Sequence, residues 1–108
     1  MLYELRTYTA MPGRLPDLHK RFEQITLGFF RKHGIGVVGF WVNEIGGPND
    51  QLIYLLAYAS LADRESRWGA FLADPERIAQ FAETEKRGPL VRRLTAQILR
   101  PTPYSPMQ

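Results

Sequence analysis

The first ten residues carry a charged pair where the pattern of a core strand predicts apolar side chains. In an extended strand Glu4, Arg6 and Tyr8 share one face, because side chains alternate between the two faces. A buried carboxylate needs a partner, and an arginine two residues away on the same face supplies one. Arg6 can also bind a ligand carboxylate, with Glu4 orienting it or acting as a base. Both interpretations stay open, and we favour the structural ion pair.

Three more aromatic residues of the predicted strands extend this candidate site, namely Trp41, Tyr54 and Tyr58. Aromatic rings offer a ligand contact area, and hydroxyl groups orient it. Aromatic residues in strands belong more often to the core, however, and we favour that interpretation. The alternative is a pocket for an aromatic or amphipathic ligand, formed by Glu4, Arg6, Tyr8, Trp41, Tyr54 and Tyr58.

Several familiar chemistries lack their residues in this chain. There is no cysteine, which excludes thiol nucleophiles, thiolate metal sites and disulfides. His19 and His33 fall near opposite ends of one predicted helix and cannot share a metal within it. The glycine-rich phosphate loops and the common hydrolase motifs are absent. We therefore expect no metal and no cofactor, with His19 as a haem ligand the alternative.

The order of predicted elements indicates an α+β fold. A strand over residues 1–10 precedes a helix that begins near Pro16 and ends before Gly34. Strands over 36–45 and 51–59 form a hairpin around the turn residues 46–50. A helix capped at Ser60 restarts at Asp74-Pro75, and the last strand covers 94–99. This is the ferredoxin-like βαββαβ order, with a four-stranded antiparallel sheet, in one domain of residues 1–108 whose residues 100–108 form a proline-rich tail.

The predicted hairpin is apolar on both faces. In residues 51–59 large apolar side chains occupy both alternating sets, as in a strand covered on two sides. The helices of this fold cover only one face of the sheet. We therefore predict a homodimer that buries the second face, sheet against sheet.

The charge pattern argues against a nucleic-acid partner. The net charge of +3 comes from small basic groups spread over the chain, not from one basic stripe. No run approaches the roughly 20 apolar residues of a membrane span, and the N-terminus lacks the pattern of a signal peptide. We therefore expect no membrane span and a cytoplasmic location.

Motifs at both ends of the chain resemble the NIPSNAP family. They are Tyr3-Glu-Leu-Arg-Thr-Tyr8 with Pro12-Gly13, Gly39-Phe-Trp-Val-Asn-Glu-Ile-Gly46, Ser60-Leu-Ala-Asp-Arg64 after Tyr58, and Ile98-Leu-Arg-Pro-Thr-Pro-Tyr-Ser-Pro106. The resemblance implies a dimeric α+β barrel, an architecture shared with small monooxygenases and haem-degrading enzymes, and brings no settled activity. The family pattern has His where Tyr54 stands. A phenol stays neutral at pH 7, so a histidine-dependent activity is not expected here.

These observations lead to two functional hypotheses. The first is a homodimeric protein that binds a small aromatic or carboxylate ligand, or has a regulatory role. The alternative is a cofactor-independent monooxygenase or isomerase acting on a small aromatic or quinone-like substrate, in which the protein supplies a dry pocket and a few hydrogen-bond donors. Whether the chain is an enzyme stays open at this point.

Overall fold

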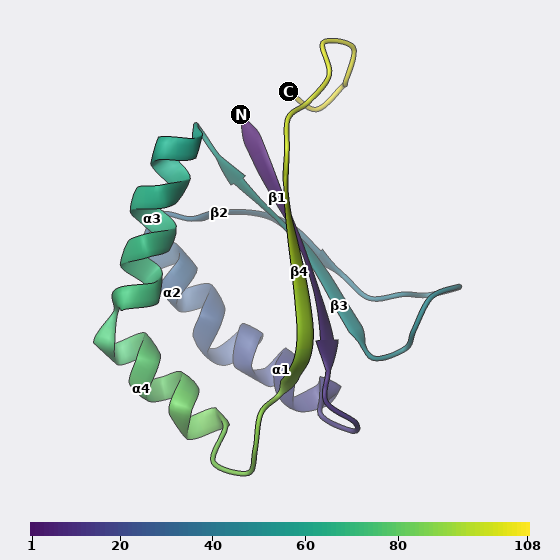
Figure 1. Cartoon of the computed structure of the whole chain (residues 1–108), viewed down its shortest axis with the longest axis vertical. Coiled ribbons are helices and arrows are strands. Elements are labelled where there is room, and N and C mark those ends of the chain that lie inside the picture. Colours follow the sequence, from purple (N-terminus) through teal and green to yellow (C-terminus); the bar gives the residue numbers. More distant parts are fainter.

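A computed structural model describes all 108 residues, and its elements follow the predicted order (Figure 1). The strands are β1 (Leu2–Ala10), β2 (Gly36–Trp41), β3 (Gln51–Tyr58) and β4 (Val91–Leu99). The helices are α1 (Leu15–Arg21), α2 (Leu27–Lys32), α3 (Leu61–Ala73) and α4 (Pro75–Thr84), with a π-helical turn, η1 (Phe22–Thr26), joining α1 to α2. None of the helices is both long and apolar enough to cross a membrane.

The sheet confirms the predicted ferredoxin-like topology. Its strand order is β2-β3-β1-β4, and all neighbouring strands are antiparallel. The register places Arg6 of β1 opposite Tyr54 of β3 on one side and Ala96 of β4 on the other. All helices lie on the same side of the sheet (Figure 1). The charged pair of β1 is therefore next to the centre of the sheet.

The two faces of the sheet differ in their cover. The helix face carries buried residues of alternating positions, including Glu4, Arg6 and Tyr8 of β1 and Leu52, Tyr54, Leu56 and Tyr58 of β3. The opposite face, which we call the open face, carries Tyr3, Leu5 and Thr7 of β1, Ile53, Leu55 and Ala57 of β3, and Trp41 of β2. No helix or strand covers the open face (Figure 1), although the C-terminal tail reaches one end of it, where the Tyr3 hydroxyl donates to the Gln108 carbonyl.

The first helix is interrupted in a way that the sequence did not predict. Pro16 lies in its first turn, and Gly34 after its end has a φ of 68°, as the cap prediction required. In its middle the Leu27 N–H donates to the carbonyl of Phe22, five residues earlier, where an α-helix has a separation of four. The turn shifts every later side chain around the helix axis.

The prediction that the second strand reaches Ile45 is wrong. β2 ends at Trp41, and residues 42–50 form a loop that extends away from the sheet (Figure 1). The side-chain amide of Asn43 donates to the Pro48 carbonyl, and Gly46 and Gly47 have φ values of 83° and 76°. These local interactions compete with strand pairing, so Ile45 is 95% exposed.

The predicted caps mark the starts of α3 and α4. The Ser60 hydroxyl accepts from the Asp63 N–H at the start of α3, and Asp74 accepts from the N–H groups of Glu76 and Arg77 at the start of α4. Asp74 also accepts from Lys32 Nζ at 2.8 Å and lies 2.7 Å from His33 Nε2. The end of α2 is thereby tied to the start of α4.

Candidate functional site

Glu4 and Arg6 form the ion pair that their spacing predicts, and a second arginine joins them. Arg6 Nη1 donates to Glu4 Oε2 at 2.8 Å. Arg64 of α3 donates from Nε to Glu4 Oε1 at 2.8 Å and from Nη2 to Oε2 at 3.1 Å. Burial raises the pKa of Glu4, but the hydrogen bonds from Arg64 and Arg6 outweigh it and hold that pKa below its ordinary value. Glu4 is therefore ionised and held by two arginines.

Arg6 extends the network to two tyrosines. Its Nε donates to the Tyr54 hydroxyl at 2.8 Å, and its Nη2 donates to the Tyr8 hydroxyl at 3.1 Å. The guanidinium carbon lies 4.5 Å from the centre of the Trp68 ring, a cation–π contact from α3. Arg6 is only 6% exposed. Hydrogen bonds from its three nitrogen atoms and an aromatic ring against its face fix its position.

The direction of the hydrogen bonds leaves one proton free. Tyr54 accepts from Arg6 and donates its own proton to the Tyr8 oxygen at 3.0 Å. Tyr8 accepts from both Arg6 and Tyr54, and its own hydroxyl proton has no acceptor within the chain. Burial raises the pKa of Tyr54, so its phenol stays protonated near neutral pH. The network therefore ends in an uncommitted O–H donor.

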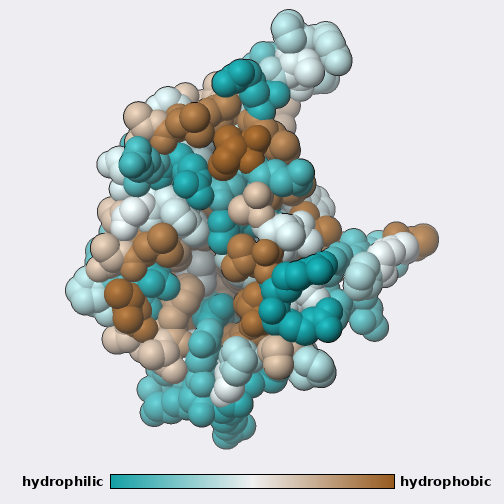
Figure 2. Space-filling view, viewed as in Figure 1, coloured by the Kyte–Doolittle hydropathy of each residue, from teal (hydrophilic) through white to brown (hydrophobic).

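A cavity of about 270 Å³ lies beside this network, between the helices and the sheet. We call it the inner cavity. Arg6, Tyr8 and Tyr54 contribute its sheet side, and aromatic side chains from the helices contribute much of the rest: Phe22, Phe30, Trp68, Phe71 and Phe81. The space-filling view shows a hollow between the helices and β4 with hydrophobic residues on both sides of it (Figure 2). Leu94 of β4 is part of the cavity lining and is 46% exposed.

The other two predicted pocket residues lie elsewhere. Tyr58 is buried at the Glu4 end of the helix face, its hydroxyl has no partner, and burial raises its pKa to about 12. Trp41 lies on the open face, paired with Ile53, and its ring packs on Gly39, where a Cβ would stand 2.8 Å from the indole. The structure therefore brings together Glu4, Arg6, Tyr8 and Tyr54 but not Trp41.

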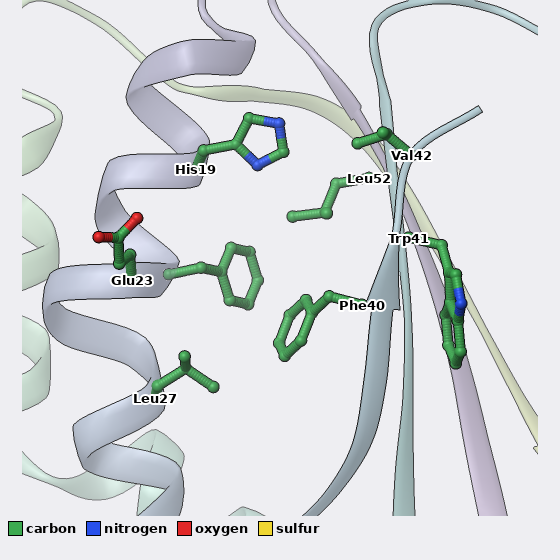
Figure 3. Close-up of a pocket in the computed structure, with 8 residues that line it drawn as sticks. His19, Glu23, Leu27, Phe40, Trp41, Val42 and Leu52 are labelled. Carbon is green, nitrogen blue, oxygen red and sulfur yellow. The ribbon is translucent and has the colours of Figure 1, made fainter. Parts of the chain in front are cut away.

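A second hollow, the outer groove, lies between the first helix and the edge of the sheet (Figure 3). It measures about 420 Å³, and His19, Glu23, Leu27, Phe40 and Leu52 are among its lining residues. Trp41 also belongs to the lining of the groove, but Figure 3 shows its ring on the far side of the strand, pointing away from the other lining residues. Phe22 lines both hollows and lies edge-on to Tyr8, with ring centres 5.6 Å apart. Phe22 is thus a shared wall between the two hollows.

Nothing in the chain gathers three or more side chains of the kinds that ligate metals. His19 faces the outer groove, and His33 is held by Asp74 at the end of α2. The two histidines are therefore in separate places, as their spacing indicated.

The comparison with known proteins agrees with the motifs. The NIPSNAP family pattern matches residues 3–106. The chain belongs to the NIPSNAP family. Among solved NIPSNAP structures, Atu4242 of Agrobacterium tumefaciens, described as of unknown function, is 30% identical with a TM-score of 0.84, over 100% of this chain and 94% of that one. The Agrobacterium protein Atu5224 is 27% identical with a TM-score of 0.86, over 99% and 98%.

The fold of this NIPSNAP chain also occurs outside the family. SnoaB, a cofactor-independent oxygenase from Streptomyces nogalater, has a TM-score of 0.60 over 96% of this chain and 97% of its own, at 14% identity. That likeness concerns the fold alone. No curated protein matches the NIPSNAP chain.

Sequence reasoning missed the helical half of this NIPSNAP site. Arg64 and Trp68 reach Glu4 and Arg6 only because α3 docks on the sheet, and no local pattern indicates these contacts, although Arg64 ends one of the family motifs. One signal was present: a fully buried carboxylate can accept more hydrogen bonds than a single arginine two residues away provides. A second arginine within the opening turns of a helix above the strand satisfies that requirement.

Proposed function

We propose that this NIPSNAP protein is a homodimer that binds a small aromatic molecule in the inner cavity. The observation that carries the proposal is the Tyr8 hydroxyl, a buried donor without an acceptor, beside a cavity with aromatic walls. A ligand carbonyl, phenol or carboxylate oxygen would accept that proton, and its ring would pack on the aromatic side chains. In this proposal Arg6 has a structural role and orients the two tyrosines.

The open face supports the dimer. Leu5 and Leu55 lie opposite each other at its centre, and Trp41 beside them is 51% exposed. A second copy packed on the same face would cover this apolar surface without leaving any polar strand edge buried.

Catalysis as a cofactor-independent oxygenase or isomerase is the second candidate. Fold-level similarity to SnoaB is the reason to test it. Such a reaction needs a group that removes a proton from the substrate, and the carboxylates beside the inner cavity, Glu4 and Glu85, are both hydrogen-bonded to arginines. Ligand binding is therefore the better-supported activity.

A thermal-shift screen tests the binding proposal. Phenols and small aromatic acids that occupy the inner cavity should raise the melting temperature of the wild-type protein, because they bind only the folded state. The Tyr8→Phe variant should lose this response while Tyr58→Phe, which removes a hydroxyl outside the cavity, keeps it. A ligand that stabilises Tyr8→Phe as well as the parent would overturn the proposal.

Two further measurements test these candidates. Both candidates predict a colourless purified protein, so a haem or flavin absorption band would contradict both and indicate a cofactor enzyme. Oxygen uptake in the presence of a hydroquinone that the screen identifies would favour the oxygenase instead.

A further inference from the structure

Two polar residues of the first helix line the inner cavity without complete hydrogen bonding. Arg21 is 6% exposed and Thr26 is 3% exposed, and both contribute to the cavity wall. Arg21 Nε and Thr26 Oγ1 are buried and have no hydrogen-bond partner in the chain. Burying such groups unpaired destabilises a fold, so their presence in one cavity calls for an explanation.

The π-helical turn explains why both reach the same cavity. In a regular α-helix, residues five positions apart point about 140° away from each other around the axis. Arg21 directly precedes η1 and Thr26 is its last residue, and the Leu27 N–H to Phe22 carbonyl bond shows the extra residue in this turn. That insertion brings positions five apart toward the same side of the helix, a distortion often found at functional sites.

Residues in and directly after α4 hold the Arg21 side chain in place. Its Nη1 donates to Glu85 Oε1 at 3.0 Å and, more weakly, to Thr84 Oγ1 at 3.4 Å. Its guanidinium carbon lies 4.5 Å from the centre of the Phe81 ring. These contacts with α4 fix the guanidinium and leave Nε unused. The side chain is therefore pre-oriented before any ligand binds.

The cavity favours an anion. Arg6, Arg21 and Arg77 line it, and Glu85 is the one carboxylate of the lining; Glu4 pairs with Arg6 from outside the lining. Glu85 is paired with Arg21, and Arg77 donates to the backbone carbonyls of Phe71 and Leu72. The groups left without partners, Arg21 Nε–H, the Tyr8 O–H and the Thr26 hydroxyl, can all donate. A ligand must therefore supply acceptors, and a negative charge adds electrostatic attraction.

We propose that Arg21 and Thr26 form the anion subsite of the inner cavity and bind the carboxylate of an aromatic acid. This inference rests on the proposed binding function, since it concerns the charged end of a ligand in the same cavity. The aromatic body lies among Phe22, Phe30 and Phe81, on the Tyr8 side of the subsite. The cavity of about 270 Å³ is at the small end for ligand pockets and suits an acid of one or two rings.

Binding of 1-naphthoate and of its neutral analogue 1-naphthamide tests the subsite. Calorimetric titration should give 1-naphthoate at least about tenfold tighter binding to the wild-type protein, as expected for hydrogen bonds to a charged acceptor. Thr26→Val keeps the shape of the side chain and removes its hydroxyl, and Arg21→Lys keeps the charge and removes the Nε–H. Each should weaken 1-naphthoate about tenfold and leave 1-naphthamide unchanged.

Lys20→Gln is the matched control, because it removes a positive charge from the neighbouring exposed position, outside the inner cavity. It should bind both probes like the parent. If Arg21→Lys does not fold, judged by circular dichroism, Thr26→Val decides the test alone.

Three results would overturn the inference. Equal binding of the acid and the amide to the wild-type protein removes the anion subsite and leaves the aromatic binding site intact. Parent-like binding of 1-naphthoate by Thr26→Val and every folded Arg21 variant assigns the carboxylate to other residues. If neither probe binds the wild-type protein, the binding proposal fails together with the subsite.

Discussion

Tyr54 donates its hydroxyl proton to Tyr8 across 3.0 Å, and this single bond gives the buried network its direction. Arg6 donates to both oxygens and can accept from neither. The chain of hydrogen bonds runs from Arg6 through Tyr54 to Tyr8, whose hydroxyl proton is left as the donor beside the inner cavity. The same relationship makes the two tyrosines unequal, because only Tyr54 has both its acceptor and its donor function used inside the chain.

Substitutions of the two buried tyrosines of β3 should have different effects on stability. Tyr54→Phe leaves the Arg6 Nε–H without an acceptor and should lower the free energy of unfolding by about 1–3 kcal/mol. Tyr58→Phe removes a buried hydroxyl that has no partner, so its effect should be neutral or slightly stabilising. Urea denaturation of both variants gives the comparison. Equal destabilisation would mean that Tyr58 has a partner in solution.

Glu4→Leu should be the most damaging single change in the network. It leaves Arg6 as a buried unpaired charge, which typically costs about 3–5 kcal/mol. Arg6→Met should be milder, because Arg64 still pairs with Glu4. In the double variant Glu4→Leu/Arg6→Met most of the loss should be recovered, a coupling that a double-mutant cycle measures. Additive losses would show that the pair is not the main source of either effect.

Asp74 should make part of the stability sensitive to acid. Hydrogen bonds from Lys32 and His33, with the backbone N–H groups of α4, hold the pKa of Asp74 well below its ordinary 3.8. Its contribution is therefore present above pH 3.8 and lost as the pH falls from there through the lower folded value. Asp74→Asn keeps a good N-cap but not the charge. Its unfolding free energy should fall less than that of the parent between pH 5 and 2, a difference that pH-dependent denaturation detects.

Leu55 is the residue of choice for testing the open face. Light scattering should show the wild-type protein as a dimer at micromolar concentration. Leu55→Asp should be poorly soluble, because the aspartate is either buried unpaired in the dimer or prevents dimerisation and leaves the rest of the apolar open face exposed. Ile45→Asp, at the exposed tip of the loop after β2, should leave both solubility and assembly unchanged. A monodisperse wild-type monomer would contradict the homodimer.

The sequence predicted most helices and strands because side-chain alternation and helix caps, which involve residues close in the chain, determine where they lie. Alternation placed Glu4, Arg6 and Tyr8 on one face, the caps at Ser60 and Asp74 marked the helix starts, and element order then allowed few topologies. The ion pair of β1 followed from the need to neutralise a buried carboxylate.

The remaining parts of the site depend on how the elements pack. Arg64 meets Glu4 only after α3 docks, sixty residues further along the chain. Trp41 was grouped with the tyrosines because a sequence does not reveal which face of β2 meets which face of β3, and that register includes an irregularity between Val37 and Gly39. The π-helical turn that orients Arg21 and Thr26 leaves no residue signature that we recognise.

The irregular edge of the sheet restricts how copies of this chain can associate. β2, one of the two outer strands, is short, contains Gly36 and Gly39, and has a break in register after Val37, all of which disfavour adding another strand there. β4 at the other edge is followed by Pro101 and Pro103, so pairing along that edge cannot continue from the strand into the tail. In the proposed homodimer, face-to-face packing occupies the open face of each copy, so association through that face stops at two copies. The arrangement thus favours a closed particle of fixed size over a growing filament.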